Sequence, residues 1–249
     1  MKPKILVLDI ETAPASGYMW KLFDVNISLS QLIDTSKLIC FAAKWHGTKN
    51  IIFHSNQEHT HKAMVKKAWA LLDEADAVVG YNSQNFDMKI LHKEFILEGL
   101  PPPSPYKNID LLKTVKNKFR FLSNKLDHVS QELGLGKKTS HQGFELWQKC
   151  LEDDSTAWKL MKKYNKQDVV LTEKLYEKLK GWIVTPCNYN NHSHNDVCPS
   201  CGSHDLMKNG IQRNRTTSYQ RYKCNNCYAH SKSTNSIKDL KRKGTVVTI

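Results

Sequence analysis

Residues 4–12 read KILVLDIET, and this stretch decides the fold. Its apolar run, residues 5–10, has the length and composition of a buried β-strand. Two acidic residues, Asp9 and Glu11, fall at the end of that run. Because residues two apart in a strand point to the same face, both carboxylates are expected on one side of a sheet. A buried carboxylate without a partner is costly, so positive charge is expected beside this strand.

Two further acidic residues interrupt apolar patterns later in the chain. Asp87 lies in residues 78–91, VVGYNSQNFDMKIL, and Asp168 lies in residues 162–175, KKYNKQDVVLTEKL. The second stretch belongs to a helical stripe with members three or four positions apart. That stripe consists of Leu160, Tyr164, Asp168, Leu171, Leu175 and Leu179. Tyr164 precedes Asp168 by one helical turn, so the hydroxyl and the carboxylate are expected to serve one site.

The remaining patterns predict an α/β fold with a mixed sheet flanked by helices. Residues 38–45 and 51–54 are typical of a strand hairpin, and residues 77–81 of a short strand. Helices are predicted for residues 61–74, 87–98, 123–133 and 155–182, the last with Ser155 as its N-cap. Asp87 is therefore expected to open a helix that follows a strand.

Divalent metal ions are the expected partners of the four carboxylates. Oxygen-only ligation is the preference of Mg²⁺ and Mn²⁺. One strand and two helices can bring such carboxylates around two cations about 4 Å apart, an arrangement that activates water and stabilises the leaving oxygen in phosphodiester hydrolysis. Tyr164 is expected to orient the attacking water by a hydrogen bond.

Each of these residues also has a structural explanation. An Asp-x-Glu pair is common by chance, Asp87 could cap a helix, and Tyr164 could be a core residue beside a solvated Asp168. Their joint occurrence in this order favours the catalytic interpretation. Asp110, in the sequence NIDLL, is interpreted as a helix cap or an ion-pair partner outside the site.

The three segments resemble the motifs of the DEDD exonuclease superfamily in its tyrosine-bearing form. The first motif is matched by Asp9, Ile10, Glu11 and Thr12, the second by Tyr81, Asn82, Asn85, Phe86 and Asp87, and the third by Tyr164 and Asp168. Residues 80–87, GYNSQNFD, are similar in particular to the proofreading domains of family B DNA polymerases.

The resemblance covers roughly residues 4–183 and implies a ribonuclease H-like fold that removes nucleotides from a 3′ end. It implies that Asp9 bridges two metals, that Glu11 and Asp168 ligate the first, and that Asp87 reaches the second chiefly through water. It favours DNA over RNA as the substrate. The nucleic-acid contacts that it implies are Thr12, Asn82, Asn85 and Phe86.

Four of the seven cysteines form two CxxC pairs, Cys198 with Cys201 and Cys224 with Cys227. The 22 residues between the pairs slightly exceed the usual separation in a zinc ribbon. Two such turns present four thiolates tetrahedrally, which predicts one structural Zn²⁺ that supplies folding free energy to a segment too small for a core. The alternatives are four free thiols, or a ligand set that includes Cys187, His192, His204 or His230.

The segment between the cysteine pairs is basic and contains tyrosines. It is similar to the zinc ribbons of transposase-associated and other DNA-binding proteins. Phosphate contacts are predicted for Lys208, Arg213, Arg215, Arg221 and Lys223, and base stacking for Tyr219 and Tyr222. The alternative is that the tyrosines pack the ribbon and the charges only solvate it.

The composition favours a polyanionic partner. The chain has 249 residues and a formal charge of +13, which suits nucleic acid better than neutral metabolites. Its length allows an exonuclease domain at 1–183, a linker at 184–197, a zinc ribbon at 198–232 and a basic tail at 233–249. The sequence shows neither a secretory signal nor an apolar run of membrane-spanning length, so we expect a cytosolic location, in the host cytoplasm if a phage encodes the protein.

These observations predict a metal-dependent 3′-5′ exonuclease that acts on a single strand or a 3′ end, with a ribbon that aids binding to nucleic acid. The chain is too short to include a polymerase, so we expect a freestanding enzyme or one that joins a replication or recombination protein. Rival hypotheses are a catalytically inactive nuclease fold acting as a DNA-binding adaptor, an RNA exonuclease, and a structure-specific endonuclease using the same site.

Overall fold

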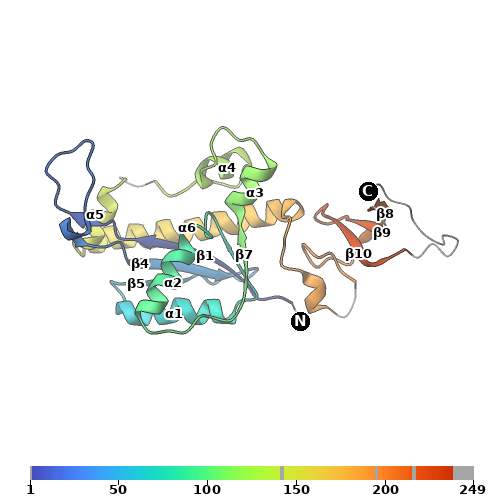
Figure 1. Cartoon of the computed structure of the whole chain (residues 1–249), viewed down its shortest axis with the longest axis horizontal. Coiled ribbons are helices and arrows are strands. Elements are labelled where there is room, and N and C mark those ends of the chain that lie inside the picture. The colour runs from blue at the N-terminus through green and yellow to red at the C-terminus, as the bar shows by residue number, and fades with distance from the viewer. Residues whose placement is uncertain (1, 141–142, 194–195, 215–216, 238–249) are drawn as a thin grey trace, which may run out of the picture. The chain divides into compact units, whose positions relative to one another are not determined.

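The computed structural model describes residues 2–140, 143–193, 196–214 and 217–237 (Figure 1). Residues Lys4–Glu177 form one compact unit, and the chain from Lys178 onward belongs to a second. Each unit contains its own sheet.

A five-stranded mixed sheet forms the centre of the first unit, with the strands in the order β5-β4-β1-β6-β7. They are β1 (Ile5–Thr12), β4 (Leu38–Trp45), β5 (Ile52–Ser55), β6 (Ala77–Gly80) and β7 (Lys107–Asp110). Strand β1 pairs antiparallel with β4 and parallel with β6, and β7 continues the parallel side. The mixed sheet predicted from the sequence is thus confirmed, and β1 is its central strand.

Helices cover this sheet. They are α1 (His61–Glu74), α2 (Asp87–Leu97), α3 (Leu111–Lys118), α4 (Leu126–Glu132), α5 (Glu145–Leu151) and α6 (Ser155–Leu179). Figure 1 shows α6 as a long helix that runs along the sheet. Within the described residues, no helix is both long enough and apolar enough to cross a lipid bilayer.

Both faces of β1 are apolar in the first half of the strand, and the face that carries Asp9 and Glu11 becomes polar only toward its C-terminal end. Leu6, Leu8 and Ile10 lie in a buried cluster with apolar residues of α1 and α2, such as Leu72 and Leu91. The intervening residues of β1 therefore point to the opposite face of the sheet. That face is the one on which α6 meets β1, as the contacts of Asp9 described below establish.

The observed elements differ from the predicted ones at short and terminal segments. Strand β7 and helices α3 and α5 were not predicted, because each has only four to eight residues and too few apolar positions for a clear period. Helix α4 begins later than expected, and α6 ends at Leu179, where a 3₁₀ turn, Lys180–Trp182, follows. Asp154 rather than Ser155 caps α6, because its Oδ1 accepts a hydrogen bond from Ala157 N at 2.7 Å.

An exposed arm lies between β1 and β4. Its base is a short antiparallel pair, β2 (Ser16–Gly17) with β3 (Leu32–Asp34), and a 3₁₀ turn at Leu29–Gln31 precedes β3. The arm presents large apolar side chains to solvent, and Trp20 is 97% exposed. Figure 1 shows the arm projecting away from the rest of the first unit.

The second unit contains a three-stranded antiparallel sheet in the order β10-β9-β8. The strands are β8 (Leu206–Arg213), β9 (Ser218–Cys224) and β10 (His230–Ser236). Strand β10 thus continues past residue 232, where we placed the end of the ribbon, and residues 238–249 of the predicted basic tail lie outside the described residues.

The segment predicted as a linker, residues 184–197, has contacts of its own within the second unit. It contains a 3₁₀ turn, Tyr189–His192, and a buried Val197. Tyr189 N donates to Pro199 O at 3.1 Å, and Val197 N donates to Asn190 Oδ1 at 2.7 Å. These contacts fold the segment back on the first CxxC turn.

Gly80 ends β6 where the chain turns toward Asp87, and a Cβ at this position would lie 2.5 Å from Ser83 Cβ. We predict that Gly80→Ala lowers the free energy of unfolding by about 1–3 kcal/mol, as overpacking in a core does. Urea denaturation measures the effect. In a Ser83→Gly background the colliding atom is gone, so the same substitution should cost less. Equal costs in both backgrounds would contradict the close approach.

Candidate active site and cysteine cluster

Three of the predicted carboxylates converge beside the sheet. Asp9 and Glu11 come from β1, and Asp168 comes from α6. One oxygen from each lies within 4.8 Å of the other two. Asp168 is 2% exposed, and Asp9 and Glu11 are half-buried. The strand period and the helix period therefore bring residues more than 150 positions apart into one cluster.

Asp87 lies outside this group of three oxygens, although the sequence motif placed it in the same site. Its side chain is buried, and its Oδ1 accepts a hydrogen bond from the backbone N–H of Ile10 at 3.3 Å. Strand β1 pairs with β6 only as far as Val7, so the carboxylate provides a partner for an amide beyond the end of that ladder. Asp87 thus holds the C-terminal part of β1 one residue after Asp9.

Burial and mutual repulsion raise the pKa values of these carboxyl groups. Burial is the largest cause of the rise in the pKa of Asp9 well above its usual range, and the charges of Glu11, Asp168 and Asp87 add to it. Burial and the charge of Asp168 raise the pKa of Glu11 to about 8. Burial raises the pKa of Asp87 to about 7. The cluster therefore requires bound protons or bound cations at neutral pH.

Lys138 supplies one positive charge that the sequence analysis did not identify. Its Nζ forms an ion pair with Asp168 and donates a hydrogen bond to the Tyr164 hydroxyl at 3.2 Å. Burial alone would lower the pKa of Lys138, but the charge of Asp168 and these two hydrogen bonds raise it. Its backbone N–H donates to Asp127 Oδ1 at 2.7 Å, which anchors the loop that carries it. A single ammonium cannot neutralise four carboxylates.

Two further residues hold the carboxylates in place. Asn165 is fully buried, and its Nδ2 donates to Asp9 Oδ2 at 2.6 Å. The side chain of Trp147, on α5, forms a hydrogen bond with Glu11, and its ring lies edge-on to that of Tyr164 with 6.0 Å between ring centres. Asn165 follows Tyr164 directly in the third motif, so its place in the sequence could have identified it as a site residue. Nothing in the sequence around Trp147 indicated a contact with Glu11.

The cluster opens into a cleft of about 490 Å³. It is lined by Asp9, Tyr81, Lys125, Leu126, Asp127, Lys138 and Tyr164. The Tyr81 hydroxyl donates to Asn124 O at 2.5 Å, which fastens the start of α4 to the end of β6. The lining of the cleft thus combines two lysines with the carboxylates of Asp9 and Asp127, and such a mixture of charges suits a phosphate group with metal ions.

The other residues of the second motif lie on the turn before α2. Asn82 has a φ of 64°, a left-handed conformation that asparagine tolerates, and its N–H donates to Asp110 Oδ1 at 2.9 Å. Asp110 also accepts from Leu112 N at 3.0 Å, so its interpretation as a helix cap is confirmed. Asn85 and Phe86 are exposed. Their contacts to nucleic acid, like that of the half-buried Thr12, stay predictions.

The acidic cluster fits a divalent cation. Its donor atoms are carboxylate oxygens alone, which Mg²⁺ and Mn²⁺ prefer. Asp168 Oδ1 is buried without a hydrogen-bond partner in the described structure, so it has unused capacity to ligate an ion. The residues present would hold the ion between Asp9, Glu11 and Asp168.

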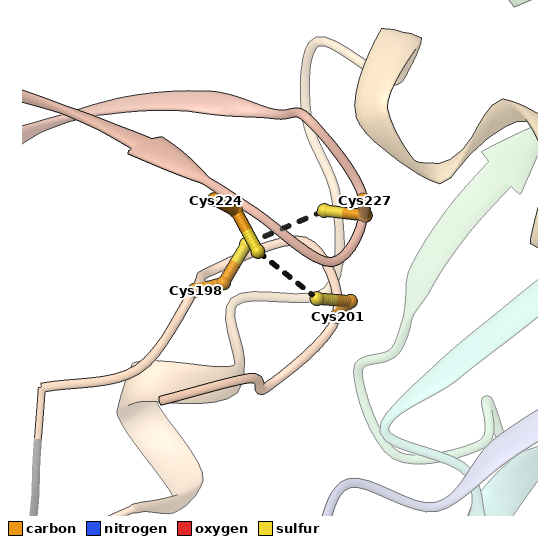
Figure 2. Close-up of side chains that lie close together, drawn as sticks. All are labelled: Cys198, Cys201, Cys224 and Cys227. Carbon is orange, nitrogen blue, oxygen red and sulfur yellow. Dashed lines mark hydrogen bonds between the residues drawn. The ribbon is translucent and has the colours of Figure 1, made fainter. Parts of the chain in front are cut away.

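The four cysteines of the second unit form the other candidate metal centre (Figure 2). Cys198 Sγ lies 3.6 Å from Cys227 Sγ, and Cys201 Sγ lies 3.7 Å from Cys224 Sγ. Four thiolates around Zn²⁺ at about 2.3 Å place their sulfurs about 3.8 Å apart, so the spacing fits a tetrahedral zinc site. The group contains cysteines alone, and His204 and His230 are exposed.

The residues predicted to bind nucleic acid in the ribbon divide between its two faces. Lys208 is opposite Tyr222, and Arg213 is opposite Ser218, so both share the face of the even-numbered residues of β9. Tyr219 and Arg221 lie on the other face, where Lys232 Nζ lies 4.5 Å from the centre of the Tyr219 ring. Arg215 lies outside the described residues.

The mixed sheet with an acidic pair on its central strand, and a helix that adds a third carboxylate, define a nuclease fold of the ribonuclease H type. The family model described as RNase_H superfamily matches residues 7–180, which is more than half of the chain, and the chain therefore belongs to that superfamily. The match extends from β1 past the end of α6 and so includes every carboxylate described above. No curated protein matches the chain significantly.

The pKa values predict how the acidic cluster responds to pH. Glu11 has a pKa of about 8 in the folded protein against 4.5 when unperturbed, so the folded state keeps a proton that the unfolded chain has lost. The stability from this group is full at low pH and declines as pH rises through that interval. Mn²⁺ should therefore raise the melting temperature more at about pH 8 than at about pH 6. At the higher pH the carboxyl groups hold fewer protons, so the ion has fewer protons to displace.

Differential scanning fluorimetry with and without MnCl₂ measures this effect. Glu11→Gln should reduce the pH dependence of the stabilisation by Mn²⁺, while Glu145→Gln, an exposed acid on α5, should leave it unchanged. Equal stabilisation at both pH values in the wild type would contradict a site built from protonated carboxyl groups.

The cysteine cluster predicts one Zn²⁺ per chain, measurable by native mass spectrometry. Cys198→Ser should lose the ion and unfold the second unit, because the cluster has little apolar surface to stabilise it otherwise. Cys187→Ser is the matched control, since Cys187 is a buried thiol outside the cluster. Zinc retained in Cys198→Ser, or lost in Cys187→Ser, would show that the ligand set is different.

Proposed function

We propose that the protein is a 3′-5′ exonuclease that uses two divalent metal ions to hydrolyse nucleic acid from an unpaired 3′ end. The observation that carries this proposal is the convergence of Asp9, Glu11 and Asp168 next to Tyr164, whose hydroxyl shares the Lys138 ammonium with Asp168. The order of the three motifs along the chain supports the exonuclease assignment, and membership of the RNase H superfamily supports nucleic acid as the substrate.

Mg²⁺ or Mn²⁺ at the carboxylates would supply the charge that activates water and stabilises the leaving oxygen. The chain's own residues do the positioning. Asn165 fixes Asp9, Trp147 fixes Glu11, and Lys138 fixes both Asp168 and Tyr164. Burial raises the pKa of Tyr164, with the charges of Asp168 and Glu11 adding to the rise, so its hydroxyl stays protonated at neutral pH. Tyr164 can therefore orient a water molecule by a hydrogen bond, but it does not remove the proton.

Single-stranded DNA is the proposed substrate. The net charge of +13 supports a polyanion, and the resemblance of GYNSQNFD to proofreading domains supports DNA over RNA. In the ribbon, Lys208 and Arg213 on one face and Arg221 with Tyr219 on the other are available to contact the strand. The proposed role of the ribbon is to retain nucleic acid, and its four cysteines would bind one Zn²⁺.

One observation favours a second candidate, a nuclease fold that binds nucleic acid without cleaving it. The Lys138 ammonium already neutralises Asp168, the only helix-borne member of the carboxylate trio. A metal ion at Asp168 must share that carboxylate with the ammonium or displace it. If Lys138 prevents metal binding, the fold would serve as a binding module.

Digestion of end-labelled single strands with Mg²⁺ or Mn²⁺ distinguishes these candidates. Asp9→Ala and Asp168→Ala should abolish hydrolysis, and Tyr164→Phe should slow it by about tenfold or more, because orientation of the water is lost while the metal site remains. Asp73→Asn is the control. It removes a carboxylate that accepts a hydrogen bond from Ser104 outside the cleft, and its rate of hydrolysis should equal that of the wild type.

The substrate controls test the direction and the need for an end. A closed single-stranded circle should resist digestion, and a 5′ label should remain on progressively shorter products. Cleavage of the circle would indicate an endonuclease, and faster digestion of matched RNA would indicate an RNA exonuclease. Intact strands under every metal condition would support the binding module.

A further inference from the structure

A second basic segment, separate from the ribbon, lies beside the cleft of the first unit. Residues 116–125 read KNKFRFLSNK and comprise the last turn of α3 and the connection from α3 to α4 (Figure 1). The segment contains four cations and no acidic residue. The cations are Lys116, Lys118, Arg120 and Lys125, and all of them are exposed.

The cations of this segment are not engaged by carboxylates. Elsewhere in the described structure, lysines such as Lys4, Lys44 and Lys162 form ion pairs with glutamates. Among the described residues, none of the four cations of residues 116–125 forms an ion pair. Lys116 and Lys118 complement the dipole at the end of α3, but Arg120 and Lys125 lie outside that helix. The positive charge is therefore available to an external anion.

Aromatic side chains alternate with these cations. Phe119 and Phe121 are half-buried, and their ring centres lie 5.7 Å apart with 45° between the planes. Phe119 begins the extended stretch that follows α3, with φ −132° and ψ 161°. Half-buried rings between exposed cations are the arrangement that single-stranded nucleic acid uses, because bases stack on rings while phosphates contact cations.

The segment leads into the cleft. Its last residue, Lys125, lines the cleft together with Asp9 and Lys138. The residue before it, Asn124, accepts the hydrogen bond from Tyr81. A strand bound along residues 116–125 can therefore continue to the carboxylates without leaving positively charged surface. The exposed arm between β2 and β3 offers no comparable positive surface, because residues 17–33 contain only one lysine and one aspartate.

We propose that residues 116–125 form a track for single-stranded nucleic acid. Lys116, Lys118 and Arg120 contact phosphates of the strand. The rings of Phe119 and Phe121 contact bases upstream of the 3′ nucleotide, which lies in the cleft. This inference rests on the proposed function for its substrate. It adds the route by which that substrate reaches the site, and it makes the first unit a nucleic-acid-binding surface independent of the ribbon.

The test measures binding of the full chain to a fluorescent oligothymidylate over a range of salt concentrations. All variants carry Asp9→Ala, so that no digestion occurs. The triple variant Lys116→Ala, Lys118→Ala, Arg120→Ala should flatten the slope of log affinity against log salt by up to about 2, which corresponds to about 0.7 per lost phosphate contact on a single strand. The matched control is Lys62→Ala, Lys66→Ala, Lys67→Ala, which removes three exposed lysines from α1 of the same unit.

A second pair of variants separates stacking from charge. Phe119→Leu with Phe121→Leu keeps apolar side chains but removes the rings, and should weaken binding about fivefold or more without changing the salt slope. Leu122→Ala, which truncates a neighbouring side chain that is 98% exposed, is the control and should bind as wild type.

The outcomes are separable from those of the proposed function. An unchanged salt slope in the triple variant, or an equal change in the α1 control, would overturn the track. If the wild-type protein proved unable to hydrolyse DNA but the triple variant still flattened the salt slope, the proposed exonuclease would be wrong and the track would stand. In an active enzyme, the track variants should raise KM for a long oligonucleotide and leave hydrolysis of a dinucleotide unchanged.

Discussion

The burial of several carboxylates around the central strand is the constraint on which the rest of the first unit depends. Asp9 and Glu11 lie on one face of β1, after the buried Ile5 and Val7 of the same face, and α6 adds Asp168 on that side. Three polar contacts reduce the resulting electrostatic cost. Asp87 is held by the Ile10 amide, Asp9 by Asn165, and Asp168 by Lys138. The raised pKa values show that these contacts are insufficient without protons or metal ions.

The residues that could be predicted were those with a local period. Two-residue alternation in β1 and the helical stripe of α6 identified Asp9, Glu11, Tyr164 and Asp168, because the period alone fixes which side of an element a residue faces. Lys138 could not be found this way, since it lies in a loop and the chain holds 37 lysines and arginines. Short elements such as β7, α3 and α5 were missed for a related reason, because tertiary packing rather than local pattern determines them.

The second unit follows a different principle. Its three strands place few apolar side chains in a core, and the buried cluster there consists of the cysteines with Ala229 and Leu206. The spacing of two CxxC pairs predicted the group correctly, but it did not predict that residues 184–197 would fold back on it through Tyr189 and Val197. That segment is rich in asparagine and resembles a linker in composition, and its backbone contacts have no sequence period.

Anomalous diffraction from a crystal soaked in Mn²⁺ tests the central claim most directly. The account predicts a manganese peak between the oxygens of Asp9, Glu11 and Asp168, with a second ion nearby toward Asp87 and with Lys138 shifted or sharing its contact to Asp168. A map with no anomalous peak at these oxygens, in which Lys138 alone neutralises the cluster, would contradict it.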